Sequence, residues 1–361
     1  MNKTTPGQLV VNWHILEACN FRCRYCFAHW PKSSAREIWR FPQRWEKLLT
    51  EIQESPKHVP GEWNGIRLNL AGGEPLLLWR NGRGPLGKIM AHADELGFAL
   101  SIISNGYLMD DAFIKAWAPK LQILGISADS ADAGINAKIG RCDTSGKQIS
   151  IQRIAEIFQL ARARHPGIEC KLNTVINAEN WRCDLRPLLE ATQPDRWKVF
   201  KMLPVADTSG ISSKQAPLKI SDGRFMSFLD HHKDFSGVMA SEDNGEMTES
   251  YLMVDPWGRF YQNEPDGFDY RHVVSAPVHK VGIAKAFDKI EFNQIKFNRR
   301  YTSPGTSPEP HVDRQETIQP AAGVGGRKHR RKTTACYPSS AKFLSAPRVS
   351  MIRGLCLAMR G

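Results

Sequence analysis

Apolar and polar positions alternate in short runs along residues 9–203, and segments of helical periodicity separate these runs. Alternating or β-branched runs predict strands, whereas apolar residues that recur every three to four positions predict helices. The predicted strands are residues 9–16, 66–70, 98–103, 121–126, 168–175 and 196–203. The predicted helices are residues 45–52, 86–96, 112–117, 149–163 and, as one turn, 185–189. Because parallel neighbours need crossover connections, this alternation predicts a parallel sheet.

The six strand–helix units indicate an α/β fold that forms an incomplete (β/α)6 barrel. Functional groups in such folds gather beyond the carboxyl ends of the strands. Three polar stretches follow predicted strand ends, namely the cysteine-rich residues 19–26, Gly72-Gly73-Glu74-Pro75 and Ser104-Asn105. Their shared position marks this end of the barrel as the expected site.

The pattern changes after the last of these units. Residues 226–245 read as a polar loop region, residues 250–255 and 259–262 as a hairpin, and residues 283–297 as helical. Beyond Arg300 the chain is rich in Pro, Ser, Thr and Gly and lacks apolar periodicity, which is typical of disorder. We therefore divide the chain into a barrel with its cysteine loop (1–220), a C-terminal extension (221–300) and a disordered basic tail (301–361).

Composition and charge limit the compartments and the partners that we expect for this protein. Hydrophobic residues make up 41% of the 361 residues, and no run approaches the ~18 apolar residues of a membrane span. The polar first seven residues predict no signal peptide, so we expect a reducing cytoplasm, with no membrane partner. Of the net charge of +12, residues 291–361 carry +9. Nucleic-acid binding is therefore not expected of the body, and only the basic tail has the charge for it.

Three cysteines, Cys19, Cys23 and Cys26, follow the first predicted strand at the spacing Cys-x3-Cys-x2-Cys. Thiolates are soft ligands, and three on one loop can hold three irons of a cubane cluster, which leaves the fourth iron open. Structural zinc sites need four ligands, and neither His14 nor His29 lies at a usual spacing. A disulfide would need an oxidising compartment. We therefore predict an open [4Fe–4S] cluster.

The cysteine spacing, with the aromatic Phe27 after the last cysteine, resembles the radical S-adenosylmethionine (SAM) superfamily. The resemblance implies a partial TIM-like barrel whose open iron binds the amino and carboxylate groups of SAM. Electron transfer from an external one-electron donor then cleaves SAM to a 5′-deoxyadenosyl radical, which abstracts a substrate hydrogen. The cofactor supplies that chemistry, and the protein supplies placement and shelter from water.

The segment Gly72-Gly73-Glu74-Pro75 resembles the superfamily's motif for the SAM amino group. Two glycines let the backbone approach the methionyl moiety, and Glu74 can accept a hydrogen bond from its ammonium. The alternative is a glycine-rich turn that caps a helix. By the same resemblance, Ser104, Ser127 and Arg141 match positions that hold the ribose and carboxylate of SAM.

A finer resemblance, to the viperin family, covers most of residues 9–300. The segments that carry it are Val11-Asn12-Trp13-His14, Leu68-Asn69-Leu70-Ala71-Gly72-Gly73-Glu74-Pro75, Ile126-Ser127-Ala128-Asp129-Ser130, Ile139-Gly140-Arg141, Lys171-Leu172-Asn173-Thr174-Val175, Arg196-Trp197-Lys198-Val199-Phe200 and Ser250-Tyr251-Leu252. The resemblance implies a nucleotide dehydratase. Such an enzyme removes the 4′ hydrogen and the 3′ hydroxyl of a ribonucleoside triphosphate (CTP, UTP or GTP). The 3′-deoxy-3′,4′-didehydro product terminates viral or phage chain synthesis.

The predicted strands place cations where a triphosphate needs them. Lys171 and Asn173 share one strand face, because they are two residues apart, and so do Arg196 and Lys198. Together with Arg67, which stands where the family usually has lysine, they predict an inward-facing polar wall. The alternative for each is a solvated charge at a strand end. The resemblance adds three further residues at the nucleotide: Asn12, Asn69 and Tyr251.

Tyr251 is the candidate donor of the hydrogen atom that quenches the final radical, and a packed core tyrosine is the alternative. The extension, residues 221–300, is expected to close the nucleotide site. Beyond Arg300 the chain departs from the family, which continues into a Gly-Gly-x-Tyr-x-Trp segment. Two other functions stay open: a radical SAM enzyme acting on a peptide or sugar, and a metal-binding protein that binds nucleic acid. The preferred nucleobase and the oligomeric state have no signal in the sequence.

Overall fold

The computed structural model describes residues 7–28, 36–207, 210–211, 213–267 and 269–301. Contacts within the chain separate residues 1–313 from residues 314–361. The second unit and the rest of the predicted tail after Tyr301 lie outside the described residues, and so does the predicted disorder.

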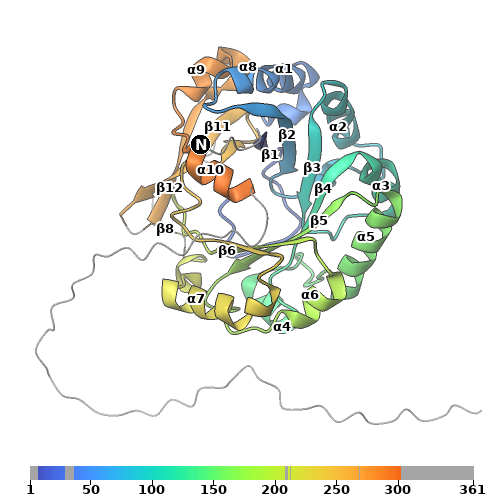
Figure 1. The fold of residues 1–361 in the computed structure, drawn as a ribbon, viewed down its shortest axis with the longest axis vertical. Coiled ribbons are helices and arrows are strands. Elements are labelled where there is room, and N and C mark those ends of the chain that lie inside the picture. Colours follow the sequence, from blue (N-terminus) through green and yellow to red (C-terminus); the bar gives the residue numbers. More distant parts are fainter. Residues whose placement is uncertain (1–6, 29–35, 208–209, 212, 268, 302–361) are drawn as a thin grey trace, which may run out of the picture. The chain divides into compact units, whose positions relative to one another are not determined.

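Six parallel strands in sequence order form the barrel wall (Figure 1). They are β1 (Gly7–His14), β2 (Trp63–Ala71), β3 (Ala99–Ser104), β4 (Leu121–Ser127), β5 (Glu169–Ile176) and β6 (Arg196–Lys201). The helices between and after them are α1 (Pro42–Gln53), α2 (Pro85–Glu95), α3 (Asp111–Trp117), α4 (Ala133–Ile139), α5 (Ile151–Arg164), α6 (Arg186–Thr192) and α7 (Asp222–His231). The predicted partial barrel is confirmed, and α4 is an addition to the predicted helices.

The extension adds strands to both edges of this sheet. Its elements are β9 (Met239–Glu242), β10 (Leu252–Val254), β11 (Arg259–Asp266), β12 (Asp269–Pro277), α8 (Val278–Val281), α9 (Ile283–Phe287) and α10 (Gln294–Tyr301). β9 pairs in parallel with β6, and β10 pairs in parallel with β1. The sheet therefore has the order β12-β11-β10-β1-β2-β3-β4-β5-β6-β9. A short hairpin, β7 (Ala206–Asp207) and β8 (Gly210–Ile211), follows β6.

Short 3-10 helices complete the described secondary structure: η1 (Ile38–Arg40), η2 (Ser55–Lys57), η3 (Pro75–Leu78), η4 (Ala118–Lys120), η5 (Ala216–Leu218) and η6 (Lys233–Phe235). None of the helices in the described residues has the length and hydropathy of a membrane-spanning segment.

Two predictions for the extension were wrong in part. Residues 226–245 are not a loop region, because α7 and β9 occupy much of them. Ser221 caps α7 by accepting from the backbone N–H of Arg224, and Phe225 and Phe228 bury the inner face of the helix. The predicted helix over residues 283–297 is two helices, α9 and α10, with a break between them. The predicted hairpin is confirmed as β10 and β11.

The strands of the barrel have two different faces. In β5 the side chains of Cys170, Leu172, Thr174 and Ile176 are buried, whereas Glu169, Lys171, Asn173 and Val175 alternate with them and are partly exposed. Since successive side chains point to opposite faces, the partly exposed set faces the barrel interior. That interior is polar, and α10 lies within the arc of strands (Figure 1).

Candidate active site

The cysteine loop leaves the carboxyl end of β1 and is joined to the glycine-rich loop that follows β2. The backbone N–H of Gly73 donates to Leu16 O (2.8 Å), and that of Glu74 donates to Ala18 O (2.9 Å). On the other side, the N–H of Arg24 donates to Ile139 O at the end of α4 (2.8 Å). Backbone hydrogen bonds therefore hold the cysteine loop between two parts of the barrel rim, the loop after β2 and the end of α4.

Close packing explains the two glycines. A Cβ atom on Gly73 would lie 2.0 Å from Ala18 O, and one on Gly72 would lie 2.7 Å from Leu16 O. Gly72 also has a φ of +133°, which side chains disfavour. We predicted that these glycines admit the methionyl moiety of SAM. In the structure they admit the backbone of the cysteine loop, and a contact with SAM stays a prediction.

The three thiols suit an iron–sulfur cluster. Cys19, Cys23 and Cys26 are partly buried and form no disulfide. Burial raises the pKa of Cys19 to about 11 and that of Cys23 to about 12, and it also raises the pKa of Cys26. Buried thiols of this kind ionise when a metal compensates the thiolate charge. Three such donors on one loop fit a cluster with one iron left open.

Two polar groups approach the sulfurs. The Asn105 Nδ2 atom lies 3.8 Å from Cys19 Sγ, and the Arg141 Nη1 atom lies 3.8 Å from Cys23 Sγ. Donors near cluster sulfurs are among the groups that set cluster potentials. Asn105 belongs to the predicted strand-end stretch, but the sequence did not indicate that it reaches the cysteines.

Glu74 and Ser104 are in contact. Glu74 is fully buried, and its Oε1 accepts from Ser104 Oγ (2.8 Å) and from the N–H of Leu76 (3.0 Å). Its Oε2 accepts from the N–H of Asn105 (2.8 Å). Burial raises the pKa of Glu74, although these donors oppose the rise. The carboxylate therefore joins the ends of β2 and β3, and its predicted role at the SAM ammonium stays a prediction.

Arg141 and Ser127 are also in contact, through a hydrogen bond from the guanidinium to Ser127 O. The same guanidinium lies 3.2 Å from the Asp129 carboxylate and 2.9 Å from the Tyr25 hydroxyl, which donates to Asp129. Sequence reasoning missed Asp129 and Tyr25, although both lie inside motifs that it used. Arg141 thus fixes the cysteine loop to β4, and its predicted contact with the SAM carboxylate stays a prediction.

Two of the three predicted asparagines, Asn12 and Asn69, are hydrogen-bonded to each other across the barrel interior. Asn69 Nδ2 donates to Asn12 Oδ1 (2.9 Å), and Ser101 Oγ donates to Asn69 Oδ1 (2.9 Å). The three residues are direct partners in the register of β1, β2 and β3. These hydrogen-bonded residues lie on the same inner wall as the predicted cations.

The predicted cations come together on that wall. Lys171 pairs in register with Arg196, and Asn173 with Lys198. Burial lowers the pKa of Lys171 well below its ordinary range, and the nearby charges of Lys198 and Arg67 lower it further. Burial also lowers the pKa of Arg67. The mutual repulsion of these groups is what an anion would relieve.

A cavity of about 460 Å³ lies at the amino ends of the strands. Its wall includes Arg67 and Arg196 from the cation set, Glu169 from β5, and Tyr301 from α10. Glu169 pairs with Arg196 at 3.1 Å. The predicted site residues therefore span the barrel, with the cysteines at the carboxyl ends and the cations toward the amino ends.

Tyr251 lies beside two residues that the sequence did not indicate, Glu242 and Arg300. Its hydroxyl donates to Glu242 Oε2 (2.6 Å), and the Arg300 guanidinium lies 3.5 Å from its ring centre. Burial raises the pKa of Tyr251 well above its ordinary value, so the phenol keeps its proton. Because Glu242 and Arg300 come from segments far apart in the chain, spacing could not have grouped them.

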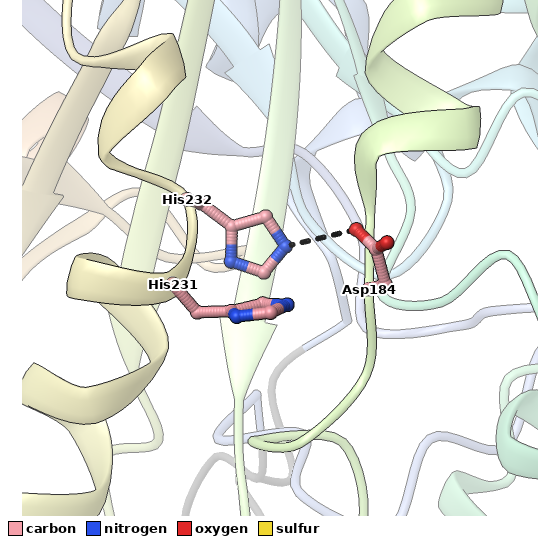
Figure 2. Close-up of side chains that lie close together, drawn as sticks. All are labelled: Asp184, His231 and His232. Atoms are coloured by element: carbon pink, nitrogen blue, oxygen red, sulfur yellow. Dashed lines mark ion pairs between the residues drawn. The ribbon is translucent and has the colours of Figure 1, made fainter. Parts of the chain in front are cut away.

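A further group of potential metal ligands in the described residues, Asp184, His231 and His232, lies at the end of α7 (Figure 2). His232 is fully buried, its Nε2 accepts from the N–H of Leu185 (3.0 Å), and its Nδ1 lies 2.9 Å from Phe228 O. A backbone N–H can only donate and a carbonyl can only accept, so both ring nitrogens are engaged. His232 therefore has a structural role in this group.

A family model and a solved structure identify the class of protein to which this chain belongs. Residues 13–183 match the family model described as the Radical SAM superfamily. The solved structure of anSMEcpe with bound AdoMet shares the fold, with a TM-score of 0.57, 17% identity and coverage of 81% of this chain and 84% of that chain. The barrel and its cysteine loop are those of a radical SAM protein, a class that uses a [4Fe–4S] cluster and SAM.

The relatives then define the family. An S-adenosylmethionine-dependent nucleotide dehydratase from Psychrobacter lutiphocae is 37% identical over 304 residues, which are 83% of this chain and 97% of the relative. One from Pseudoalteromonas ulvae is 36% identical over 311 residues, which are 84% of this chain and 96% of the relative. The chain belongs to the S-adenosylmethionine-dependent nucleotide dehydratase family, and the viperin resemblance is thereby confirmed.

Proposed function

We propose that this protein dehydrates a ribonucleoside triphosphate to its 3′-deoxy-3′,4′-didehydro analogue. The substrate would be CTP, UTP or GTP, and the product would end viral or phage chain synthesis. The observation that carries the proposal is the polar inner wall of the barrel, where Lys171, Arg196 and Lys198 lie on neighbouring strands and the charge of Arg67 helps to lower the pKa of Lys171.

The charge of this interior suits a triphosphate. Five cations (Arg67, Lys171, Arg196, Lys198 and Arg300) share the interior with two carboxylates (Glu169 and Glu242). A nucleoside triphosphate carries about four negative charges at neutral pH. It would offset the excess positive charge, and several cations from different strands would hold its phosphates at once.

The cofactor would occupy the other end of the barrel. Cys19, Cys23 and Cys26 would hold the cluster, and the loops of Gly72, Gly73 and Glu74 and of Ser104, Ser127 and Arg141 would hold SAM. Bound there, the cluster and SAM would supply the one-electron chemistry that removes a hydrogen atom from the ribose. Asn12, Asn69 and Asn173 would position the nucleotide between the two ends.

The protein's own groups would complete the reaction. Tyr251 keeps its proton and would donate a hydrogen atom at the end of the reaction. The extension, residues 221–300, would close the nucleotide site, as the position of α10 against Arg67 supports. An external one-electron donor would serve the cluster, in a reducing cytoplasm.

Anaerobic turnover tests the proposal. The reconstituted protein is given dithionite, SAM and one of CTP, UTP, GTP and ATP, and 5′-deoxyadenosine is measured together with a nucleotide lighter by one water. Formation of both products only with a nucleotide is the expected result, and the best nucleotide identifies the base. Cleavage of SAM that no nucleotide stimulates would contradict the substrate assignment.

Two variants sharpen this test. Cys23→Ala should abolish cluster assembly and turnover, whereas Cys142→Ala, a change at a partly buried free cysteine outside the loop, should leave both intact. Lys171→Ala should spare the cluster and weaken nucleotide binding. Equal effects of Cys23→Ala and Cys142→Ala would contradict the assignment of the cluster ligands.

A further inference from the structure

Glu242, the last residue of the edge strand β9, is a buried carboxylate beside Lys198, one of the predicted cations. Its side chain is 6% exposed. Its Oε1 forms an ion pair with Lys198 Nζ and accepts from Arg300 Nε (2.8 Å). Its Oε2 accepts from the Tyr251 hydroxyl (2.6 Å). One carboxylate thus contacts the candidate hydrogen donor, a candidate phosphate ligand and α10.

The charge state of this group is well defined. Burial alone would raise the pKa of Glu242, but Arg300 and Lys198 outweigh burial and lower it to about 2. The carboxylate is therefore ionised at neutral pH. The Tyr251 phenol is protonated, so the hydrogen bond between them runs from Tyr251 to Glu242. A charged acceptor fixes the direction of this hydroxyl more strongly than a neutral one would.

Arg300 connects this carboxylate to the rest of the extension. Besides Glu242, its guanidinium donates to Ser250 O (2.5 Å) and to Glu246 O (2.6 Å). These carbonyls lie in the connection between β9 and β10, which also carries Tyr251. The side chains of Glu242 and Arg300 therefore hold α10, this connection and β6 together.

We propose that Glu242 is a positioning residue of the nucleotide site, which aims the Tyr251 hydroxyl and restrains the Lys198 ammonium at the same time. The proposal deepens the dehydratase function above and rests on it. Glu242 need not touch the nucleotide, because it acts through the two groups that would. A carboxylate in a site for an anionic substrate would repel that substrate. The contacts of Glu242 with Tyr251 and Lys198 explain why a carboxylate is nevertheless present there.

Two opposite effects follow from this arrangement. The carboxylate competes with phosphate for Lys198, so removing its charge should tighten binding of a polyphosphate by about 5-fold at a pH below the pKa of Lys198, which Glu242 itself helps to raise. The same change weakens the hold on Tyr251. At metal sites, loss of a partner that orients a ligand lowers activity by about 10- to 100-fold, and we expect a fall in kcat of that order here. A residue that only stabilised the fold would not separate binding from turnover in this way.

The experiment uses the reconstituted holoenzyme in three variants. Glu242→Gln removes the charge and keeps the shape, Glu242→Asp keeps the charge and withdraws it by one methylene, and Glu249→Gln changes a partly exposed carboxylate that pairs with Lys296. Calorimetry gives the dissociation constant of inorganic tripolyphosphate. Turnover gives kcat and KM, and thermal denaturation gives Tm.

The expected results differ between the variants. Glu242→Gln binds tripolyphosphate more tightly and has a lower kcat, Glu242→Asp has a lower kcat without tighter binding, and Glu249→Gln resembles the wild type. Unchanged binding and kcat in Glu242→Gln would overturn the proposal. So would weaker binding that accompanies a large fall in Tm, because that result describes a purely structural residue.

Failure of the dehydratase function would look different. A wild-type protein that turns over no nucleotide would refute the substrate assignment. Tripolyphosphate binding would then still test whether Glu242 competes with phosphate for Lys198. Tighter binding by Glu242→Gln supports this competition, and unchanged binding refutes it.

Discussion

Arg141 and Asp129 form a buried ion pair beside the cysteine loop, with 3.2 Å between Nη1 and Oδ2 and side chains that are 6% and 1% exposed. Burial opposes the charged form of Arg141, but Asp129, Tyr25 and Cys23 outweigh burial and raise the pKa of Arg141. The pair anchors the loop that carries the three cysteines to β4.

Asp129→Asn should therefore lower the free energy of unfolding by about 3–5 kcal/mol, because it leaves a buried guanidinium without its counter-charge. Urea denaturation measures the change. Asp111→Asn is the control, since it disrupts a pair with Arg153 that is largely exposed on the Asp111 side and should cost less than about 1 kcal/mol. Equal losses of unfolding free energy in the two variants would show that the buried ion pair stabilises the fold no more than the exposed one.

Gly73→Ala should prevent the cysteine loop from docking, because the new Cβ would lie 2.0 Å from Ala18 O. We expect less than half of the wild-type iron after reconstitution, measured by iron and sulfide analysis. Gly223→Ala, in the first turn of α7, meets no atom within 4 Å and should bind the normal amount of iron. Full iron loading of Gly73→Ala would contradict this account of the glycine.

Nucleotide affinity should fall as the pH rises through about 8. In the free protein, burial lowers the pKa of Lys198 to about 8, with Arg300 and Arg196 adding to the shift and Glu242 opposing it. A bound phosphate stabilises the ammonium, so binding takes up a proton above this pH and affinity falls by up to about tenfold per pH unit.

Calorimetry in buffers of different ionisation enthalpy measures that proton uptake directly. Lys198→Arg is the matched variant, because a guanidinium stays charged over the whole range and should flatten the pH dependence. A wild-type affinity that does not change between pH 7 and pH 9.5 would rule out this role for Lys198.

Lys171→Met should stabilise the fold while it weakens the site. The partly exposed Lys171 ammonium is desolvated and is repelled by Lys198 and Arg67, so its removal should raise the free energy of unfolding by roughly 0.5–2 kcal/mol. Loss of a charged contact to phosphate should weaken nucleotide binding by about 10- to 100-fold. Thermal denaturation and calorimetry measure the two effects, and Lys120→Met, at an exposed lysine, should change neither. A destabilised Lys171→Met would show that the lysine is a structural residue.

Local signals made much of the fold predictable. Each strand of the barrel has its own apolar pattern, and the cysteine spacing lies within eight residues, Cys19 to Cys26. The alternation of Lys171 with Leu172 and Asn173 also predicted correctly which side chains share the inner face.

The prediction of a loop region at residues 226–245 was wrong for a physical reason. β9 is short, and Glu242 is a polar strand residue because Lys198, Tyr251 and Arg300 surround it.

The sequence alone determined the class of cofactor, the strands of the barrel and the inward side of β5 and β6, because residue type and spacing encode these features directly. Only the tertiary structure decided that Gly72 and Gly73 pack against the cysteine loop, that Arg141 pairs with Asp129, and that Glu242 joins Tyr251 to Lys198 and Arg300. Each of these contacts joins segments far apart in the chain, and the free energy of burying such groups depends on partners that no local pattern names.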